Sequence, residues 1–552
     1  MKKLSIVFFV ILFSKLSLAQ EKPQGRGLKT NSVHEENFIR KEWKEIDPSH
    51  FPHSFANPAQ VDNSVLPSFP PIASQGSQNS CVSWAITYYQ LSHAIGMAKG
   101  WNNKTSDLSM KFSPKWSYNM VNGGADNGSS SSQVYKMLQY HGALNLIDRP
   151  YDLEYRSWPT DTNLWRKALV NRIDTPQIIS SLSTDTGMNT AKTILASGYV
   201  LTFGTYIDSW QYQTVKDNPL TNTDDAEVGK SVVAWQNGSV GGHMMTIVGY
   251  NDDLWTDING NGTVDTGELG AFRVANSWGT NWKDKGFIWI TYDAFKATSA
   301  VSGGPSLNRV GLSQNDRAYH IIPKLNYQPR LTAEINLAHD YRNQITISLG
   351  SSGLSSTTPT TTLAQGIMQA QGGAYAFDGG TSKINQRFVL DMTDLIPANG
   401  GDQKYFITLT DTDTGTSVDV TDFVLVDNEH LSKSVSADGT PTSFASSTKN
   451  FGINWNQSTG SAPTIDTTAP QVSVTYTRTS SNYVFNATAS DQSGISKVAF
   501  YLDGRILSTD TTAPYSASML LKKMTAGLHF IEAIATDNAG NSGSTGRISF
   551  SK

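Results

Sequence analysis

The residue best able to do chemistry is Cys81, the only cysteine among 552 residues. The residues before it, Gly76 to Ser80, are small and polar, and an apolar, aromatic stretch with helical spacing follows. Cys81 is therefore predicted to lie in the first turn of a helix, where free backbone N–H groups and the helix dipole stabilise a thiolate. The alternative is an inert core cysteine, because a free cysteine also behaves as a small apolar residue.

Two later segments could supply partners for this thiol. The run Gly241–Tyr250 begins with His243 and continues as an apolar strand, and the run Phe272–Trp282 contains Asn276. A thiol with a pKa of about 8.5 is mostly protonated at neutral pH, so it needs a base and a third group that orients the base. Taken alone, each segment also has an ordinary interpretation, as a core histidine and as a turn at a strand end.

Taken in order, these blocks resemble the papain-like cysteine peptidases. That family has a Gln six residues before the Cys, a His opening a strand that ends in V-G-Y, and N-S-W-G with a second Trp four residues on. The residues that match this pattern, in the family's order, are Gln75, Cys81, His243, Asn276, Trp278 and Trp282. The resemblance covers about residues 56–322 and implies an α+β two-lobed peptidase domain, with a helical half led by the cysteine helix and a β half.

The resemblance also implies a role for each matching residue. Cys81 would attack the scissile carbonyl and form a thioester acyl-enzyme, and His243 would act as acid and base. Asn276 would orient the imidazole under the cover of Trp278, with Trp282 as further support. Gln75 and the backbone N–H of Cys81 would hold the oxyanion, where losing one donor typically costs ~10²–10³ in rate. The implied substrates are proteins or peptides, and no redox or organic cofactor is implied for catalysis.

Two departures from the familiar plant and lysosomal pattern concern the loop before the nucleophile. Val82 stands where a Trp usually follows the Cys, and the aromatic residue is displaced to Trp84. The disulfide cysteines that normally brace this loop are absent, with Gln78 at the usual upstream position. The chemical groups are untouched by these changes, so something other than a disulfide must rigidify the loop.

Two other functions remain open from the sequence. A transglutaminase-like or peptide-ligating acyl transferase also uses Cys, His and an orienting residue in this order, but the Gln75 spacing and the Asn-Ser-Trp-Gly block argue against it. The other hypothesis is a non-catalytic surface adhesin on a peptidase scaffold. The complete set of catalytic residues argues against that hypothesis, and product analysis with an added amine would separate hydrolysis from transfer.

A calcium-binding pattern lies between His243 and Asn276. Residues 257–268 match the twelve-residue loop D-x-N-x-N-G-x5-E, in which Gly262 permits the sharp turn. The oxygen ligands would come from Asp257, Asn259, Asn261, the Thr263 carbonyl, Asp265 and a bidentate Glu268. The flanking residues read as strands, so we expect a structural calcium clip on a hairpin rather than a helix-pair sensor. The alternative is a metal-free turn rich in Asn and Gly.

Composition and the N-terminus indicate a secreted protein. The net charge is −4 with 16% charged residues, which gives no electrostatic case for binding nucleic acid or an anionic membrane. Residues 1–19 have the charged start, apolar segment and small-residue cleavage site of a signal peptide, and their apolar run is too short for a membrane span. We expect an extracellular or surface location, the periplasm included. Residues 20–55, with a short helix near Glu36–Lys44, would be a pro-segment or a flexible tail.

The remaining chain reads as β-rich. Residues 323–455 alternate short period-2 strands with turns and are predicted to form a β-sandwich. A Ser, Thr, Pro and Gly linker at 456–469 leads to residues 470–552, which resemble the bacterial Ig-like modules through their repeated A-x-D-x-x-G turns. Tyr476 and Tyr501 could contact carbohydrate or a cell surface, although aromatic residues in such strands more often pack in the core.

Overall fold

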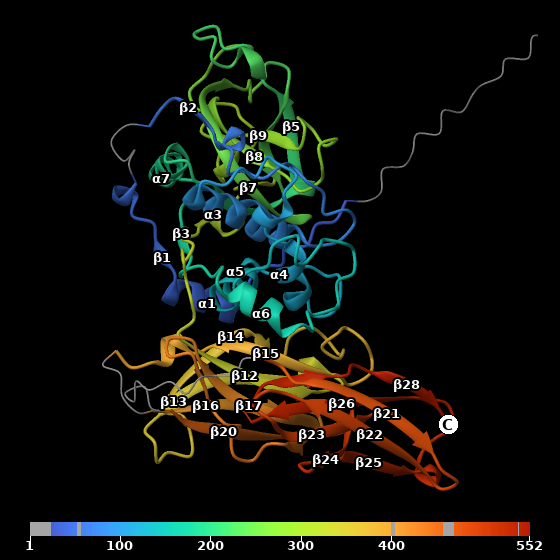
Figure 1. Cartoon of the computed structure of the whole chain (residues 1–552). Coiled ribbons are helices and arrows are strands. Elements are labelled where there is room, and N and C mark those ends of the chain that lie inside the picture. Colours follow the sequence, from blue (N-terminus) through green and yellow to red (C-terminus); the bar gives the residue numbers. More distant parts are fainter. Residues whose placement is uncertain (1–23, 52–56, 399–402, 456–467, 539) are drawn as a thin grey trace, which may run out of the picture.

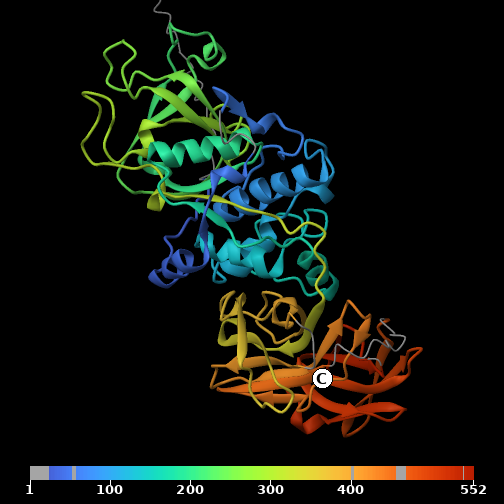
Figure 2. The ribbon, with the colours of Figure 1, turned by 90° about the vertical axis from the view of Figure 1, so that its left-hand side faces the viewer.

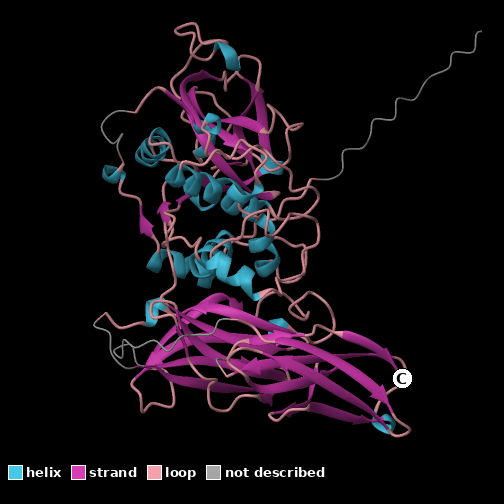
Figure 3. Cartoon of the chain, viewed as in Figure 1, coloured by secondary structure: helices cyan, strands magenta, loops and turns pink. Residues whose placement is uncertain are grey.

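The computed structural model describes residues 24–51, 57–398, 403–455, 468–538 and 540–552. The predicted signal peptide at 1–19 and nearly all of the predicted linker at 456–469 lie outside these residues. Helices gather in the upper half of the molecule in Figure 3, and the lower half is almost entirely strands. Among the described residues, no helix is long and apolar enough to cross a membrane.

The upper half contains the helices that surround Cys81. A continuous helix begins at Cys81 as α2 (Cys81–Ser83), widens into a π-helical stretch, η3 (Trp84–Leu91), and ends as α3 (Ser92–Lys99) at Gly100 in a left-handed conformation. The other α-helices are α1 (Val33–Glu42), α4 (Pro114–Val121), α5 (Ser131–His141), α6 (Thr162–Leu169) and α7 (Asp185–Ala196). Every residue from Cys81 to Ile95 is buried, so this helix forms the centre of the helical half.

The β half is an 11-stranded sheet with the order β1-β3-β11-β4-β7-β8-β9-β6-β10, to which β2 adds on β7 and β5 on β6. Its strands are β1 (Lys44–Glu45), β2 (Gln60–Asp62), β3 (Gln177–Ile179), β4 (Leu201–Tyr206), β5 (Trp210–Thr214), β6 (Ser231–Asn237), β7 (Gly242–Trp255), β8 (Leu269–Ala275), β9 (Phe287–Thr291), β10 (Arg309–Val310) and β11 (Ala318–His320). The two-lobed α+β arrangement expected from the sequence is therefore present, with the sheet above the helices in Figure 1.

Residues 331–455 form two facing sheets, as the period-2 pattern predicts. One sheet has β12 (Leu331–Ala338), β15 (Asn385–Asp391), β17 (Val418–Asp427), β18 (Ser432–Lys433) and β19 (Thr442–Phe444). The other has β13 (Ile345–Ser352), β14 (Thr361–Gln369), β16 (Gln403–Asp411) and β20 (Ser447–Trp455). Apolar side chains from both sheets share one buried cluster, for example Ile335 and Leu409.

The C-terminal module is a second, smaller sandwich. One sheet contains β21 (Gln471–Arg478), β22 (Asn482–Ser490) and β25 (Tyr515–Leu520). The other contains β23 (Ile495–Leu502), β24 (Arg505–Asp510), β26 (Leu528–Asp537), β27 (Ser542–Ser544) and β28 (Ile548–Ser551).

Short 3-10 turns join these elements. They are η1 (Pro48–His50), η2 (Asn63–Val65), η4 (Leu108–Met110), η5 (Ile207–Ser209), η6 (Asp225–Glu227), η7 (Asp293–Phe295), η8 (Gln314–Asp316), η9 (Arg342–Gln344), η10 (Thr393–Leu395) and η11 (Leu521–Lys523). The turn η5 joins β4 to β5 near His243, since Ile207 and Asp208 hydrogen-bond to the backbone of Gly241 and Val240.

The helical half rests directly on the first sandwich. The helices α5 and α6 contact the strands β14 and β15, and the second view in Figure 2 also places the helical layer against the upper edge of the sandwich. Trp165 of α6 packs edge-on against Phe388 of β15 with 5.1 Å between ring centroids. The hydrophobic core of the helical half and that of the sandwich are therefore continuous.

Candidate active site

The β half holds His243 and Asn276 in direct contact. His243 is the second residue of β7, and Asn276 follows the last residue of the antiparallel strand β8. The imidazole Nε2 and the Asn276 Oδ1 are 2.8 Å apart, and both residues are buried. The Trp278 ring lies against the imidazole, with 4.8 Å between centroids, and Trp282 packs edge-on behind Trp278. The bond to Asn276 engages one ring nitrogen, and His243 Nδ1 is buried without a hydrogen-bond partner among the described residues.

The helical half places Cys81 against the strand that carries His243, because α2 contacts β7. The thiol is fully buried, and the backbone of Met244, the residue that follows His243 in β7, partly offsets the effect of burial on the Cys81 pKa. The sequence prediction that Cys81 starts a helix is confirmed, because α2 begins at this residue. His93, further along the same helix, is a core residue held by Ser68 and the Gly198 carbonyl.

Gln75 projects its amide toward the start of the cysteine helix. Its Nε2 donates to the Gln78 carbonyl at 2.7 Å and to the Arg26 carbonyl at 3.2 Å. The Arg26 carbonyl also accepts a hydrogen bond from the Cys81 backbone N–H at 3.3 Å. One carbonyl oxygen thus receives both donors that the sequence analysis assigned to an oxyanion site.

Ser277 fixes the orientation of Gln75, a role that the sequence analysis did not assign. Its hydroxyl donates to Gln75 Oε1 at 2.5 Å, and its carbonyl accepts from the Gln75 backbone N–H at 2.8 Å. The amide oxygen is thereby engaged and the Nε2 is aimed at the carbonyl. The signal was visible in the Asn-Ser-Trp-Gly block, where a hydroxyl residue directly follows the histidine-orienting asparagine.

Hydrogen bonds replace the missing disulfide around residues 75–80. The Tyr151 hydroxyl donates to the Gln75 carbonyl at 2.9 Å, lies 2.8 Å from Gln78 Oε1, and contacts the Ser80 hydroxyl at 2.9 Å. On the other side, Asn79 bonds to Asp126 through both its backbone and its side-chain amide. Tyr151 and Asp126 were not predicted, because nothing local in the sequence pairs them with this loop.

Residues 24–29 lie against the site as an irregular segment whose single β-bridge is formed by Leu28. Trp278 Nε1 donates to the Gly25 carbonyl at 2.9 Å, and Leu28 N–H donates to the Gly242 carbonyl at 3.2 Å. Ser129 exchanges backbone hydrogen bonds with the same segment, and its pairing with Leu28 is parallel. The segment therefore runs from Trp278, past Cys81, to the loop before α5.

Glycines of the domain let residues 24–29 lie close to the site. A Cβ atom on Gly128 would lie 2.0 Å from the Gly27 carbonyl oxygen, and one on Gly242 would lie 2.4 Å from that of Leu28. The sequence analysis interpreted residues 20–55 as a pro-segment or a flexible tail, and these glycine contacts show where part of it meets the site. The following residues belong to the body of the domain, since Ile39 and Trp43 are buried in its main core cluster.

With residues 24–29 in place, the Cys81 thiol and the His243 imidazole are both kept neutral. Burial raises the pKa of the Cys81 thiol to about 12. Burial also lowers the pKa of His243 to about 4, although the hydrogen bond that its Nε2–H donates to Asn276 Oδ1 opposes this shift. A thiolate–imidazolium pair is therefore disfavoured at neutral pH in this arrangement.

The predicted calcium loop lies between β7 and β8 and has the turn structure expected from its sequence. Asp257 accepts the Gly262 N–H at 3.0 Å, and Asn259 and Asn261 each accept the N–H two residues on. Asp257 Oδ1 is buried and has no hydrogen-bond partner in the described part of the chain, which suits a cation ligand. Thr263 is held by Asn261, and Asp265 Oδ2 accepts the side-chain amides of both asparagines.

Glu268 is engaged differently from the bidentate ligand that was predicted. Its two carboxylate oxygens accept hydrogen bonds from the backbone of Ile258, Asn259 and Asp265 and from the Trp255 indole. In the structure this buried carboxylate therefore closes the loop through N–H donors. To bind a cation bidentately, it would have to release some of them.

A second group of oxygen ligands was not predicted. The carboxylates of Asp217, Asp224 and Asp225 each offer an oxygen within 4.8 Å of the others, so this acidic triad could bind a metal. Asp224 is buried, and its Oδ1 has no hydrogen-bond partner among the described residues. The triad lies in the connection from β5 to β6, which pairs with Trp255 through the backbone of Lys216.

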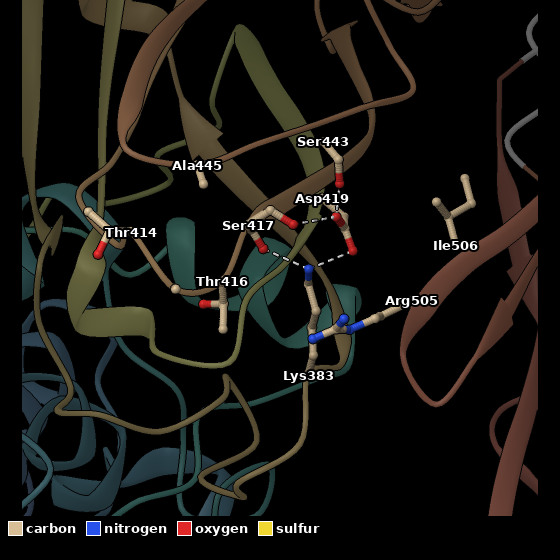
Figure 4. Close-up of a pocket in the computed structure, with 10 residues that line it drawn as sticks. Lys383, Thr414, Thr416, Ser417, Asp419, Ser443, Ala445, Arg505 and Ile506 are labelled. Atoms are coloured by element: carbon tan, nitrogen blue, oxygen red, sulfur yellow. Dashed lines mark hydrogen bonds and ion pairs between the residues drawn. The ribbon is translucent and has the colours of Figure 1, made fainter. Parts of the chain in front are cut away.

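A polar pocket of about 360 Å³, shown in Figure 4, lies at the junction of the two β modules. The ammonium of Lys383 points into this junction, lies 2.6 Å from Asp419 and donates to the Ser417 carbonyl. The buried charge of Lys383 is therefore already paired. The carbohydrate-contact interpretation of Tyr501 is wrong, since this residue is 1% exposed and bonds to Thr421, whereas Tyr476 is 41% exposed.

Comparisons with known proteins agree with this division of the chain. Residues 463–533 match the family model described as bacterial Ig domain. The C-terminal module is a bacterial Ig-like domain. No curated protein matches the sequence.

Among solved structures, the chain is similar to xylellain, a cysteine protease from Xylella fastidiosa, at 16% identity over 55% of this chain and 99% of that chain, with a TM-score of 0.36. It is similar to procathepsin L2 proteinase from Tenebrio molitor larval midgut at 17% identity over 56% and 82%, with a TM-score of 0.37. The bromelain protease from Ananas comosus matches at 15% identity over 49% and 99%, with a TM-score of 0.33. Likenesses at such low identity and score say nothing about activity or substrate.

Proposed function

We propose that this chain is a secreted papain-like cysteine endopeptidase that hydrolyses peptide bonds through a Cys81 thioester. One observation carries the proposal: a single carbonyl oxygen receives hydrogen bonds from the Gln75 side chain and the Cys81 N–H. Beside it, the His243–Asn276 pair leaves one imidazole nitrogen free of protein partners among the described residues. This set contains a nucleophile, a base, an orienting group and two oxyanion donors.

The chemistry follows from these positions. The Cys81 thiolate attacks the substrate carbonyl, and the resulting oxyanion is held by Gln75 Nε2 and the Cys81 N–H. His243 gives its proton to the leaving amine as the C–N bond breaks, which leaves a thioester. His243 then takes a proton from water as the water oxygen attacks the thioester carbonyl. The C–S bond breaks, the product acid forms, and the Cys81 thiolate is left beside the protonated His243. Asn276 keeps the imidazole in one orientation throughout.

We propose further that residues 24–29 keep the chain latent. The segment fills the oxyanion position with its own carbonyl and keeps the Cys81 pKa high and the His243 pKa low by excluding water. Lys29 and Thr30 are exposed, so cleavage there would free the segment without disturbing α1. The pro-segment thus acts through its first described residues, and the part from Val33 onward belongs to the mature domain.

We propose that the loop 257–268 binds a structural Ca²⁺. The unpartnered Asp257 oxygen and the neighbouring Asn259, Asn261 and Asp265 side chains are hard oxygen donors of the kind calcium prefers. A bound ion would stabilise the hairpin that joins His243 to Asn276 and would take no part in the reaction. The signal peptide and the Ig-like module support an extracellular or surface location in a bacterium.

Peptide cleavage by the chain after it has been cut at Lys29 tests the enzymatic proposal. A mixed peptide library should be hydrolysed by the wild type and left intact by Cys81→Ala and His243→Ala, with product termini identified by mass spectrometry. Addition of a primary amine should give free acids rather than amides as the main products. Amide products would favour an acyl transferase, and no turnover despite a folded, cut chain would favour the non-catalytic adhesin.

A further inference from the structure

A charged contact holds Arg26 in the site. Its guanidinium lies 2.5 Å from the Asp208 carboxylate, and its Cζ lies 5.5 Å from the centre of the Trp278 ring. The backbone of the same residue is fixed as well, because its N–H donates to Asn79 Oδ1 and its carbonyl takes the two oxyanion donors. The Arg26 guanidinium therefore contacts both the Asp208 carboxylate and the Trp278 ring. The carbonyl of the same residue accepts from Gln75 Nε2 and the Cys81 N–H.

Asp208 is built into the wall of the site beside the catalytic histidine. It lies in η5, and its N–H donates to the Val240 carbonyl at 3.2 Å. Gly241 adopts a φ of +78°, and a Cβ atom there would come within 2.2 Å of the Asp208 carboxylate. Any larger residue at position 241, two residues before His243, would therefore collide with the Asp208 carboxylate.

Arg26 is the only ion-pair partner of Asp208 among the described residues. The Asp208 side chain is 36% exposed even with Arg26 in place. Once the N-terminal segment leaves, an accessible carboxylate without an internal cation faces the site. Such a carboxylate, next to an aromatic face, is suited to the side chain of an arginine or lysine.

The position of Trp278 indicates which part of a substrate would reach this subsite. The ring packs on His243, and this histidine gives its proton to the leaving amine in the proposed reaction. The residue that follows the scissile bond carries that amine. Its side chain therefore leaves the reacting centre on the side of Trp278 and Asp208.

We propose that Asp208 and Trp278 form a subsite for a basic side chain, and that the preferred substrates carry Arg or Lys directly after the scissile bond. This inference rests on the proposed peptidase function. In the latent chain, Arg26 occupies the same subsite. An exposed ion pair together with a cation–π contact corresponds to a preference of roughly tenfold in kcat/KM.

The test uses the full chain cut at Lys29 and peptides that differ only in the residue after the scissile bond: Arg, Lys, Gln or Glu. The wild type is expected to cleave the Arg peptide about tenfold better than the Gln peptide, by kcat/KM. Asp208→Asn should bring the Arg-to-Gln ratio to about one, and Asp208→Lys should favour the Glu peptide. Asp185→Asn, an exposed acid on α7, is the matched control and should keep the wild-type ratio.

Cleavage with no Arg preference, or a preference that survives in Asp208→Asn, would overturn the subsite while leaving the peptidase function intact. A second readout does not depend on turnover. In the uncut chain, Arg26→Gln should speed the alkylation of Cys81 several-fold, and Arg26→Lys should stay near wild type. Equal alkylation rates in all three chains would show that the guanidinium contact does not hold the segment, and would count against the subsite.

Discussion

In the proposed reaction, Ser277 acts through Gln75 and does not touch the substrate. Its hydroxyl holds the Gln75 amide oxygen at 2.5 Å and so leaves the amide N–H for the oxyanion. Ser277→Ala is expected to lower kcat about tenfold with little change in KM, because the donor is needed mainly in the transition state. Steady-state kinetics on one peptide checks this, and Ser277→Thr, which keeps a hydroxyl, should recover part of the rate. An unchanged kcat in Ser277→Ala would remove this positioning role.

His141 offers a test of buried neutral histidines. Burial lowers its pKa to about 3, and neither ring nitrogen has a hydrogen-bond partner among the described residues. The unfolded chain binds a proton here near pH 6.5 and the folded chain does not, so this residue reduces stability as pH falls from about 6.5 toward 3. His141→Leu should flatten the fall in Tm over that range. A melting curve series from pH 8 to 4 that shows equal slopes for both chains would contradict the assignment.

Much of the residue-scale site could be predicted, because the family-like spacing marks residues that share one chemical task. Gln75 and Cys81 share the Arg26 carbonyl as a hydrogen-bond acceptor, and His243 is bonded to Asn276, whereas the catalytic roles of these residues stay a prediction. Tyr151 and Arg26 could not be predicted in the same way. Their contacts with the site join residues about 50 to 75 positions apart, and only the chain path brings them together.

At the scale of elements, the hairpin between β7 and β8 joins His243 to Asn276. Calcium in the loop 257–268 should stabilise this hairpin, because binding to the native state alone raises stability by mass action. Removing calcium with a chelator is expected to lower Tm by about 5 °C, and Asp257→Asn should abolish that difference. Calorimetry with and without calcium measures both.

Asp225→Asn provides the matched control, since it alters the separate acidic triad and should leave the chelator effect in place. If Asp225→Asn and not Asp257→Asn abolished the effect, calcium would act at the triad instead. A Tm that ignores the chelator would contradict a structural calcium at either position.

The elements themselves were largely predictable from local pattern. Strand alternation gave the β sandwiches, and the loop sequence gave the turns at Asp257, Asn259 and Asn261. The fate of Glu268 was not predictable, because its partners include the indole of Trp255 across the hairpin. Local pattern specifies a turn, whereas the hydrogen bonds of a buried carboxylate depend on the strands around it.

At the scale of the whole molecule, the first sandwich packs against the helical half. Arg172 and Asp391 form a buried ion pair of 2.5 Å across this junction, and Tyr327 also donates to the carboxylate. Asp391→Ala is expected to cost about 3–5 kcal/mol, because it leaves the buried Arg172 guanidinium with only the longer, 3.4 Å ion pair to the half-exposed Asp394. Glu429→Gln, in the exposed pair with Arg330, should cost about 0–1 kcal/mol. Urea denaturation measures both, and equal losses would contradict a structural junction.

The sequence divided the chain into modules but gave no sign that the first two share a core. From the sequence, Trp165 could equally have packed inside its own domain. Its contact with Phe388 depends on the sandwich lying against α6. Interfaces between modules are built from apolar residues that look like any other core in sequence. Their partners become visible only when the modules are placed together.

The most direct test of the central claim is the rate of Cys81 alkylation by an epoxysuccinyl peptide at about pH 6, read by intact mass. We expect slow labelling of the uncut chain, whose Cys81 pKa is raised to about 12, and rapid one-to-one labelling after cleavage at Lys29. His243→Ala should abolish the rapid phase in the cut chain. Slow labelling that is equal in the cut wild type and in cut His243→Ala would mean an ordinary thiol and would contradict a His243-activated nucleophile.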